Sequence, residues 1–446
     1  MNPRGSNLVL VKRKTRTRRL SSINFMLVPD RQGPQPMATI LAYTSPAFGN
    51  LFPILALMIE LQRRGHRVVL KTLDDGVTIG RDVGVESSAI DPRIEAAVMT
   101  DWMETNGRAA LKAAFNVFGH RAAYEVDDLR GAISQVRPDA VLVDANCWGA
   151  AAAADAGSVP WLSFWPFTPF LRSRGVPPFG PGLRPWSGLV GRLRDEALRP
   201  LVTGALNDAM LGPVNAVRET AGVEAVRSVD ELLRRASLML VATGEPLEYP
   251  HPDWGDRVEL IGPCEFDPPA PAPQWLTEID QPIVLVTTSS DRQADSQLPI
   301  AAMAALADEP VRVVATYPSG VPDGLVAPPN AVVKQFVPHG MVLDRAVCAI
   351  THGGMGATQK ALARGVPVCV VPYGRDQFEV ARRVEVSGGG TRLPAKKLTA
   401  VRLKSKVLQA MSMTSGAQRV ADGFKRTGGV ARGADVVERR LLGLPA

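Results

Sequence analysis

Short apolar runs alternate along the chain with longer segments in which apolar residues recur at helical spacing. In the first half, runs at residues 38–44, 68–70 and 140–143 predict buried strands. Residues 53–64 predict a helix between the first two of these strands, and Gly65 is suited to end it. Alternating strands and helices of this kind predict parallel sheets covered by helices.

The same pattern begins again in the second half of the chain. Residues 283–287 and 311–315 predict strands, and residues 298–306 predict the helix between them. Between the two halves, residues 262–273 read GPCEFDPPAPAP, which is the extended and stiff composition of a linker. We therefore predict an α/β protein with two Rossmann-like domains. The predicted domain bounds are 37–261 and 276–446, with a linker at 262–275.

The net charge of +7 comes from the first 36 residues of the chain. These contain eight basic residues and one acidic residue, so the remainder is neutral. The basic run KRKTRTRR has no interleaved aromatic residue and no periodicity, which predicts a disordered basic tail at residues 1–36 and no nucleic-acid partner. No stretch of the sequence is long and apolar enough to predict a membrane span or a secretory signal.

The cysteines are too scattered for a metal site or a disulfide framework. They are Cys147, Cys264, Cys348 and Cys369. Two of them fall in predicted buried strands, so we expect all four to be core thiols in a reducing cytoplasm.

The most informative stretch of the sequence lies between residues 336 and 377. An apolar run at 347–350 stops at Thr351 and His352, and a glycine-rich turn, a helix and another strand follow it. The glycines of this turn are Gly353, Gly354 and Gly356. Glycines let a ligand approach the backbone, and the unpaired N–H groups that open a helix favour an anion such as phosphate. A tight turn without a ligand is the alternative.

This stretch resembles the nucleotide-sugar signature of the inverting two-domain glycosyltransferases, the superfamily of UDP-glycosyltransferases and bacterial natural-product glycosyltransferases. The resemblance implies that Phe336 stacks on the base of the nucleotide and that the backbone of Val337 pairs with the base edge. It also implies that Asp376 and Gln377 hold hydroxyls of the donor sugar. The residues that it assigns to the diphosphate are His352, Gly353, Gly354, Gly356 and Ala357.

Two features of the donor half leave alternatives open. Ser289 and Ser290 follow the first predicted strand of the second domain, so their hydroxyls either meet the diphosphate from the opposite wall or belong to a simple polar turn. The family usually has an acidic residue eight positions after the turn histidine, where it accepts hydrogen bonds from the ribose, but this chain has Lys360 there. Because a lysine has no acceptor, the choice between a uridine and a thymidine donor stays open.

The first strand–helix–strand unit resembles the acceptor side of the family, with one departure. Where the family has a histidine or aspartate that deprotonates the acceptor, this chain has Asn50, and a neutral amide cannot take a proton. The predicted strand at 140–143 is followed by Asp144, which in relatives orients the catalytic histidine. Without an imidazole, Asp144 would act directly or through water. The alternative is that Asp144 caps the alanine-rich helix after it.

Three expectations concern the surroundings of this unit. We interpret the aromatic and proline residues of 161–170, with the Pro- and Gly-rich loop that continues to Trp186, as the lining of an apolar acceptor pocket and not as a continuous core strand or helix. His66 follows Gly65 and is predicted to be a surface residue of the turn. Helices are predicted from Thr399 onward, with Thr399 as a cap, and the resemblance implies that the last one crosses back onto the first domain.

The resemblance implies that the two Rossmann-like domains face each other across a cleft, as in the B-type glycosyltransferase fold. It further implies a metal-independent glycosyltransferase that moves a hexose from a UDP- or dTDP-sugar to a hydroxyl of a lipophilic small molecule with inversion. No cofactor is expected besides the donor, and the chain has no Asp-x-Asp pair of the kind that metal-dependent glycosyltransferases use. A nucleotide-sugar-binding protein with impaired catalysis and a sugar-nucleotide epimerase of the same fold are the alternatives. We expect a cytoplasmic monomer or homodimer.

Overall fold

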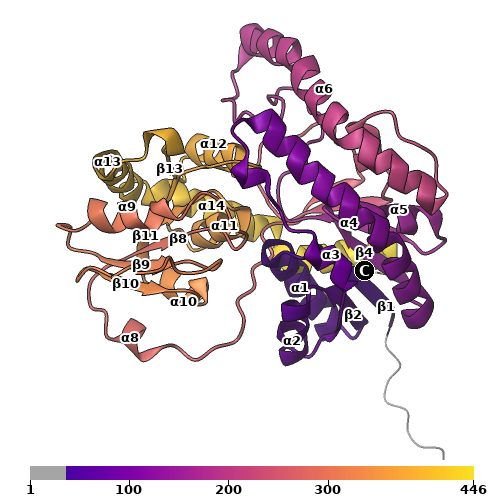
Figure 1. Ribbon diagram of the computed structural model, residues 1–446, viewed down its shortest axis with the longest axis horizontal. Helices are drawn as coiled ribbons and strands as arrows, with labels where there is room; N and C mark the ends of the chain where they lie inside the picture. Colours follow the sequence, from indigo (N-terminus) through magenta and orange to yellow (C-terminus); the bar gives the residue numbers. More distant parts are fainter. Residues whose placement is uncertain (1–36, 446) are drawn as a thin grey trace, which may run out of the picture. The chain divides into compact units, whose positions relative to one another are not determined.

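The computed structural model describes residues 37–445, which form two parallel β-sheets covered by helices (Figure 1). The predicted tail at residues 1–36 lies outside the described residues. All four cysteines are buried and free of disulfide bonds, as expected for core thiols. Within residues 37–445, no helix combines the length and the apolar character needed to cross a membrane. The predicted fold class, two α/β domains with parallel sheets, is confirmed.

In the described part of the chain, the first sheet has seven parallel strands in the order β3-β2-β1-β4-β5-β6-β7. Its strands are β1 (Thr39–Tyr43), β2 (Arg67–Thr72), β3 (Glu86–Ala89), β4 (Ala140–Asp144), β5 (Trp161–Trp165), β6 (Leu238–Val241) and β7 (Val258–Leu260). Its helices are α1 (Phe48–Arg63), α2 (Asp74–Asp82), α3 (Pro92–Ala96), η1 (Asp101–Met103), α4 (Gly107–Val136), α5 (Trp148–Ala156), α6 (Gly188–Ala221) and α7 (Val229–Leu233). Side chains from both faces of the sheet form separate cores with these helices, which explains why the central strands are apolar throughout.

The second sheet, again within residues 37–445, has six parallel strands in the order β10-β9-β8-β11-β12-β13. Its strands are β8 (Ile283–Thr287), β9 (Arg312–Thr316), β10 (Ala331–Lys334), β11 (Ala346–Thr351), β12 (Val368–Val370) and β13 (Gly390–Arg392). Its helices are α8 (Gln274–Thr277), α9 (Gln297–Ala305), α10 (His339–Leu343), α11 (Met355–Ala363), α12 (Gln377–Ser387), η2 (Ala395–Lys397), α13 (Ala400–Met411) and α14 (Thr414–Thr427). As predicted, Thr399 caps α13, where its Oγ1 accepts a hydrogen bond from the Arg402 N–H at 3.3 Å.

In both sheets the chain order reverses between two central strands. The reversal lies between β1 and β4 in the first sheet and between β8 and β11 in the second. Ligands of open parallel sheets bind at the carboxyl ends of strands where the order reverses. Asp144 is the last residue of β4, and His352 follows β11 directly. The fold therefore places the predicted acceptor residues at one reversal and the predicted diphosphate residues at the other.

The first helix begins earlier than predicted. It starts at Phe48 and includes Pro53, so Asn50 lies in its first turn and not in a loop. The sequence suggested Pro53 as the start because proline suits the first turn of a helix. The difference matters for the site, because a helical Asn50 has a fixed direction.

The structure also corrects the prediction for residues 161–170. Residues Trp161–Trp165 form β5, a core strand that pairs with β4 and β6. Pro160 and Pro166 flank the strand and interrupt no hydrogen bond within it, so these prolines set its ends instead of excluding it.

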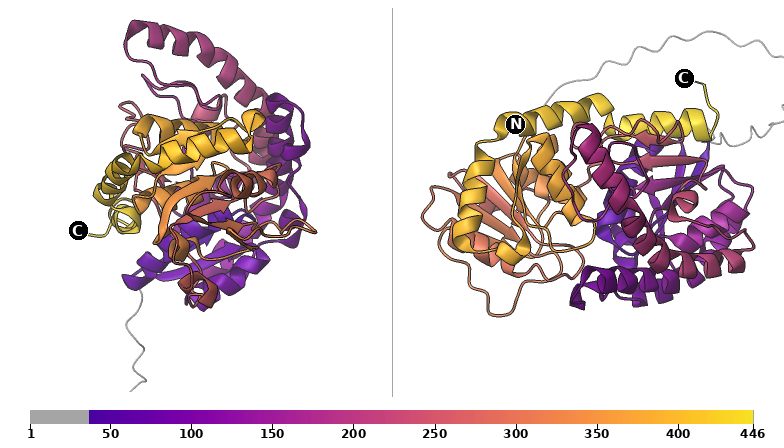
Figure 2. Two further views of the ribbon diagram at one scale, coloured as in Figure 1. Left: turned by 90° about the vertical axis from the view of Figure 1, so that its left-hand side faces the viewer. Right: turned by 90° about the horizontal axis from the view of Figure 1, so that it is seen from above.

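The end of the chain packs against α1, as the resemblance implied. The last helical segments are α15 (Gly429–Val436) and η3 (Val437–Leu441), and Figure 2 shows how they continue from α14 to the side of the first sheet. Ala434, Val436 and Val437 complete the core beneath α1. His66, predicted to be at the surface, is only 3% exposed, and its Nε2 lies 3.1 Å from Glu438 Oε1. That prediction was wrong because the covering helix comes from the far end of the sequence.

Candidate functional site

Asp144 is the centre of a buried hydrogen-bond cluster at the carboxyl end of β4. One carboxylate oxygen, Oδ2, accepts hydrogen bonds from the N–H of Ser45 at 2.9 Å and from the Ser45 hydroxyl. The side-chain amide of Asn50 donates to both carboxylate oxygens, at 2.7 Å to Oδ1 and 2.9 Å to Oδ2. Burial raises the pKa of Asp144, and the hydrogen bonds from Ser45 and Asn50 oppose that shift.

This cluster brings Asn50 and Asp144 together and fixes the orientation of the Asn50 amide. Because the Asn50 Nδ2 faces Asp144, its Oδ1 points the other way, and no hydrogen bond from residues 37–445 reaches it. An acceptor hydroxyl can donate a hydrogen bond to that oxygen, but the amide cannot remove the proton. Asp144 is 1% exposed and its oxygens already accept several hydrogen bonds, so its contact to a substrate would run through Asn50 or Ser45.

The suggested cap role for Asp144 belongs to another residue. The N–H groups at the start of α5 donate to Glu125 Oε2, at 2.8 Å from Gly149 and 3.4 Å from Ala150. Glu125 lies on α4 and is fully buried, and burial raises its pKa to about 8. Sequence reasoning missed Glu125 and Ser45, because a single polar position inside a helix or after a strand does not reveal its distant partner.

A small cavity of about 40 Å³ lies beside Asp144. Its aromatic and aliphatic lining includes Trp148, Trp161, Trp165, Met210, Val214 and Leu233. Two of the aromatic residues proposed for the acceptor pocket, Trp161 and Trp165, therefore face the cavity together with Asp144. The cavity has room for about one or two water molecules, so a larger acceptor would need these side chains to move.

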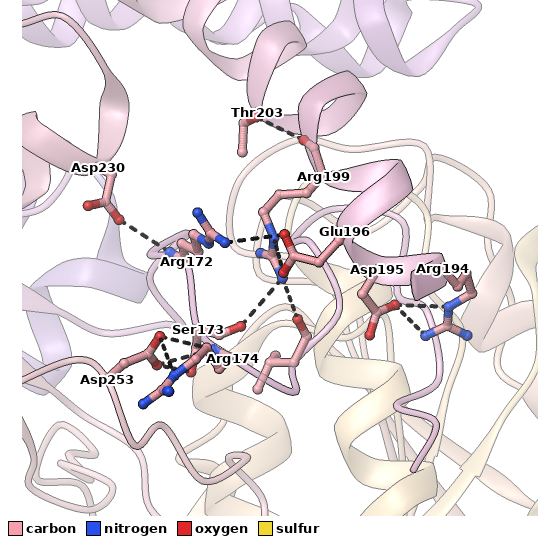
Figure 3. Close-up of polar contacts among 11 residues, drawn as sticks. Arg172, Ser173, Arg174, Arg194, Asp195, Glu196, Arg199, Thr203, Asp230 and Asp253 are labelled. Atoms are coloured by element: carbon pink, nitrogen blue, oxygen red, sulfur yellow. Dashed lines mark hydrogen bonds and ion pairs between the residues drawn. The ribbon is translucent and has the colours of Figure 1, made fainter. Parts of the chain in front are cut away.

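The Pro- and Gly-rich loop after β5 is held in place by α6 and its neighbours (Figure 3). Arg199 of α6 donates to the carbonyl oxygens of Ser173 at 3.4 Å and Val176 at 3.2 Å. Asp253 accepts from the Ser173 hydroxyl at 2.8 Å and from the Arg174 N–H at 3.1 Å. Hydrogen bonds from Arg199 and to Asp253 therefore fix the conformation of the loop beside the predicted acceptor side.

On the donor side, the turn after β11 is built around the ring of His352. This residue is 7% exposed, and its Nδ1 lies 4.0 Å from Asp295 Oδ2 without a hydrogen-bond partner among the described residues. Burial lowers the pKa of His352 to about 4, and the positive charge of Arg375 adds to that shift. The imidazole is therefore neutral near pH 7.

The glycines of this turn are required by close packing. Gly353 has a φ of 99°, and a Cβ there would lie 2.9 Å from the Cβ of Gln377. A Cβ on Gly354 would lie 2.5 Å from His352 Nε2. Gly356 and Ala357 follow in the first turn of α11, where the N–H groups have no acceptor inside the helix. The turn thus presents an imidazole and free N–H groups together.

We expect Gly354→Ala to weaken nucleotide-sugar binding by about tenfold or more. The new methyl group must displace the buried ring of His352, and the expected hydrogen bond from this ring to the charged diphosphate is then lost. Gly356→Ala is the matched control, since a Cβ there meets no atom within 4 Å. Isothermal titration of both variants checks this expectation. Equal affinities for both variants and the parent would show that the ring does not contact the ligand.

The two predicted serines differ in their surroundings. Ser289 is buried, and its hydroxyl accepts hydrogen bonds from the Asp291 N–H at 3.2 Å and from Gln293 at 2.9 Å. Its own N–H donates to Asp295 Oδ2 at 2.6 Å. Ser290 is exposed. Ser289 therefore organises the loop after β8, whereas Ser290 is the one free to reach a ligand.

The predicted base site lies beside α10. Phe336 is 50% exposed, as a ring available for stacking would be, whereas the side chain of Val337 is buried in the core. The unusual Lys360 is nearly buried and its Nζ pairs with Asp267 Oδ1 at 2.6 Å. Asp267, from the stretch between the two sheets, also accepts the Gly340 N–H at 2.9 Å. The carboxylate of Asp267 thus lies beside Lys360, at the position where the sequence alone indicated only a lysine.

Asp376 and Gln377 lie at the start of α12, close to the glycine turn. Burial raises the pKa of Asp376 to about 6. The Gln377 Oε1 accepts the N–H groups of Tyr373 at 2.7 Å and Gly374 at 3.1 Å, and its Nε2 donates to Gln293 Oε1 at 2.6 Å. Gln377 therefore holds its own turn together and would have to exchange Gln293 for a sugar hydroxyl. Within residues 37–445, no group of three or more His, Cys, Asp and Glu side chains is arranged to hold a metal ion.

Comparisons of the sequence with known proteins find relatives along nearly the whole chain. Residues 300–427 match the family model for the C-terminal domain of proteins like erythromycin biosynthesis protein CIII. The chain is 29% identical to 4'-demethylrebeccamycin synthase of Lentzea aerocolonigenes over 90% of this chain and 99% of the relative. It is 24% identical to the NDP-glycosyltransferase YjiC of Bacillus subtilis over 88% of this chain and 95% of the relative.

One solved structure is similar over nearly the whole chain. The glycotransferase of kitacinnamycin superposes with a TM-score of 0.68 at 25% identity, over 92% of this chain and 100% of that protein. Over nearly its whole length the chain is therefore similar to two-domain glycosyltransferases with the B-type fold, a group that includes natural-product glycosyltransferases.

Proposed function

We propose that this chain transfers a hexose from a UDP- or dTDP-sugar to a hydroxyl of a lipophilic small molecule, with inversion at the anomeric carbon and without a metal ion or cofactor. The observation that carries the proposal is the position of His352 and the open first turn of α11 at the strand-order reversal of the second sheet. The aromatic lining beside Asp144 supports an apolar acceptor. The relatives named for natural products favour the same substrate class.

The proposed chemistry is a displacement in which the nucleoside diphosphate leaves as the acceptor oxygen bonds to the anomeric carbon. Negative charge then gathers on the diphosphate while the sugar becomes cationic. In this proposal the diphosphate binds at the turn after β11, and the free N–H groups of the first turn of α11 and the imidazole of His352 stabilise that charge. Because the free His352 is neutral near pH 7, its contribution in the resting site is a hydrogen bond and not a full charge.

On the acceptor side, the proposal assigns Asn50 to orienting the hydroxyl and Asp144 to orienting Asn50. The proton passes to water late in such a displacement, when the acceptor oxygen has become acidic through its bond to the anomeric carbon, so a hydroxyl that ionises easily needs least help. The absence of an imidazole at position 50 also supports a second candidate, a protein that binds nucleotide sugars with impaired catalysis.

Two measurements distinguish these candidates. A thermal-shift panel of UDP- and dTDP-sugars identifies the donor, because a ligand that binds only the folded state raises the melting temperature. Hydrolysis of that donor in the absence of an acceptor then separates the candidates, since a transferase transfers some sugar to water and a binding protein releases none. A chain that no nucleotide sugar stabilises would refute both.

We expect His352→Ala to weaken binding of the nucleotide sugar, or to lower turnover, by about tenfold or more, as for the loss of a hydrogen bond to a charged group. The parent should also bind more tightly as the pH falls from 8 towards 5. A bound diphosphate favours the imidazolium, so it raises the pKa of His352 from about 4, and binding then takes up a proton. His352→Ala should lose this pH dependence, and a variant with the parent's affinity and pH profile would contradict the donor-site assignment.

A further inference from the structure

Arg375 joins the two halves of the chain immediately before the predicted sugar-binding pair. Its Nε lies 2.9 Å from Asp101 Oδ2 and its Nη2 lies 2.9 Å from Asp101 Oδ1, which is a bidentate ion pair. Its Nη1 donates to Asp291 Oδ2 at 3.0 Å. Asp101 belongs to η1, on the side of the first sheet, whereas Asp291 lies in the loop after β8. One guanidinium therefore binds carboxylates from both halves.

The backbone of Arg375 supports a special role for this contact. Its φ is 52°, in the left-handed region that side chains with a Cβ rarely adopt. Within residues 37–445, Arg137 is the other non-glycine residue with such a φ, and it ends α4, where that conformation is common. Arg375 instead precedes α12, in a turn held both by the ion pairs of its side chain and by the bonds from Tyr373 and Gly374 to Gln377.

The short helix that carries Asp101 is itself docked on the second half of the chain. The guanidinium of Arg292 lies over the ring of Trp102 at 5.4 Å from the centroid. The side chain of Asp101 is 7% exposed and that of Arg375 23% exposed. Burial by itself would lower the pKa of Arg375, but the hydrogen bonds and charges of Asp101 and Asp291 outweigh it and raise the pKa, so the guanidinium stays ionised. A partly buried bidentate pair of this kind is screened less than a surface pair.

A second contact ties the other end of the same turn to the first half. Glu379, in the first turn of α12, accepts the N–H groups of Gly180 and Gly182 at 2.8 Å each. Gly182 has a φ of 60°, and a Cβ there would collide with the backbone of Phe378. Residues 376 and 377 are thus enclosed between two ties, one through Arg375 and one through Glu379.

We propose that Arg375 is a positioning residue through which Asp101, on the acceptor side of the molecule, sets the geometry of Asp376 and Gln377 toward the donor sugar. The inference rests on the proposed function for the ligand that this turn holds. It predicts that Asp101, which lies in the other half of the chain, controls recognition of the sugar but not of the nucleoside diphosphate. It also predicts that an acceptor that moves η1 changes the affinity for the donor sugar.

The test compares two probes on the full chain, the nucleotide sugar and the matching nucleoside diphosphate without sugar. Asp101→Asn and Arg375→Lys should each weaken binding of the nucleotide sugar by about tenfold, as expected for the loss of a charge-assisted contact. Neither change should alter the affinity for UDP or dTDP by more than about twofold. Asp291→Asn is the matched control and should have the smaller effect on the sugar, because Asp291 is more exposed and makes one hydrogen bond to Arg375.

A double variant shows whether the two residues act through one contact. The double variant with Asp101→Asn and Arg375→Lys should weaken binding of the nucleotide sugar no more than either change alone. Equal losses for both probes would overturn the inference, because Arg375 would then act on the phosphates or on the whole fold. If the parent binds the nucleotide sugar and the variants bind both probes as tightly as the parent does, the inference is wrong and the proposed function stands. A parent that binds no nucleotide sugar would instead refute the proposed function, and this inference with it.

Discussion

An Asn50→His variant should transfer sugar to weakly acidic alcohols about 10² to 10⁴ times faster than the parent, the gain that a positioned general base supplies. Asn50 lies in the first turn of α1 with its amide nitrogen 2.7 Å from Asp144 Oδ1, so an imidazole there can donate one N–H to the same carboxylate and turn its other nitrogen to the acceptor. Phenols, which ionise more easily, should gain less.

The measurement is kcat/KM for an aliphatic alcohol and a phenol of similar size, with donor affinity measured in parallel. Asn50→Gln is the matched control, because it keeps an amide and supplies no base, and it should give no gain. If Asn50→His has no effect on any acceptor while its donor affinity equals that of the parent, the assignment of position 50 to the acceptor proton is wrong.

Replacing Asp144 by Asn should reduce sugar transfer by about a hundredfold or more and leave donor affinity within about twofold of the parent. The new amide group must place an NH₂ opposite the N–H of Ser45 or the amide of Asn50, and each buried donor that loses its acceptor costs about 1–3 kcal/mol. Asn50 then loses the partner that fixes its direction. Donor binding should be spared because Asp144 belongs to the first sheet and the diphosphate turn to the second.

A thermal unfolding curve of Asp144→Asn separates loss of folding from loss of orientation. The same change made in the Asn50→His background should remove the gain from the histidine, because the imidazole would lose its carboxylate. A fully active Asp144→Asn would leave the acceptor half of the proposal without support, and a nucleotide-sugar-binding protein would become the leading explanation if the parent were also inactive.

The second half of the fold could be predicted well because its signals are local. Residues 283–287 were predicted as a strand and form β8, since a strand buried on both faces is apolar throughout. The glycine turn after β11 was predictable because its glycines are required by backbone conformation and close packing. In both cases the determining contacts lie within a short stretch of sequence.

What could not be predicted depends on partners far away in the chain. Nothing near Arg375 indicates that it pairs with Asp101, which lies 274 positions earlier. The buried state of His66 depends on Glu438, and the direction of Asn50 on Asp144. Long-range pairs of this kind depend on how the sheets and helices pack, and local patterns in a single sequence do not reveal that packing.

The packing of the chain end on α1 also constrains the order in which the protein forms during synthesis. Ala434, Val436 and Val437 complete the core beneath α1, so one face of the first sheet stays incomplete until the ribosome has made the entire second sheet. Domains near the amino terminus usually fold while the rest of a chain is still being translated. Here the core beneath α1 keeps part of its apolar surface exposed until residues 434–437 have been made, so this part of the amino-terminal domain is completed last.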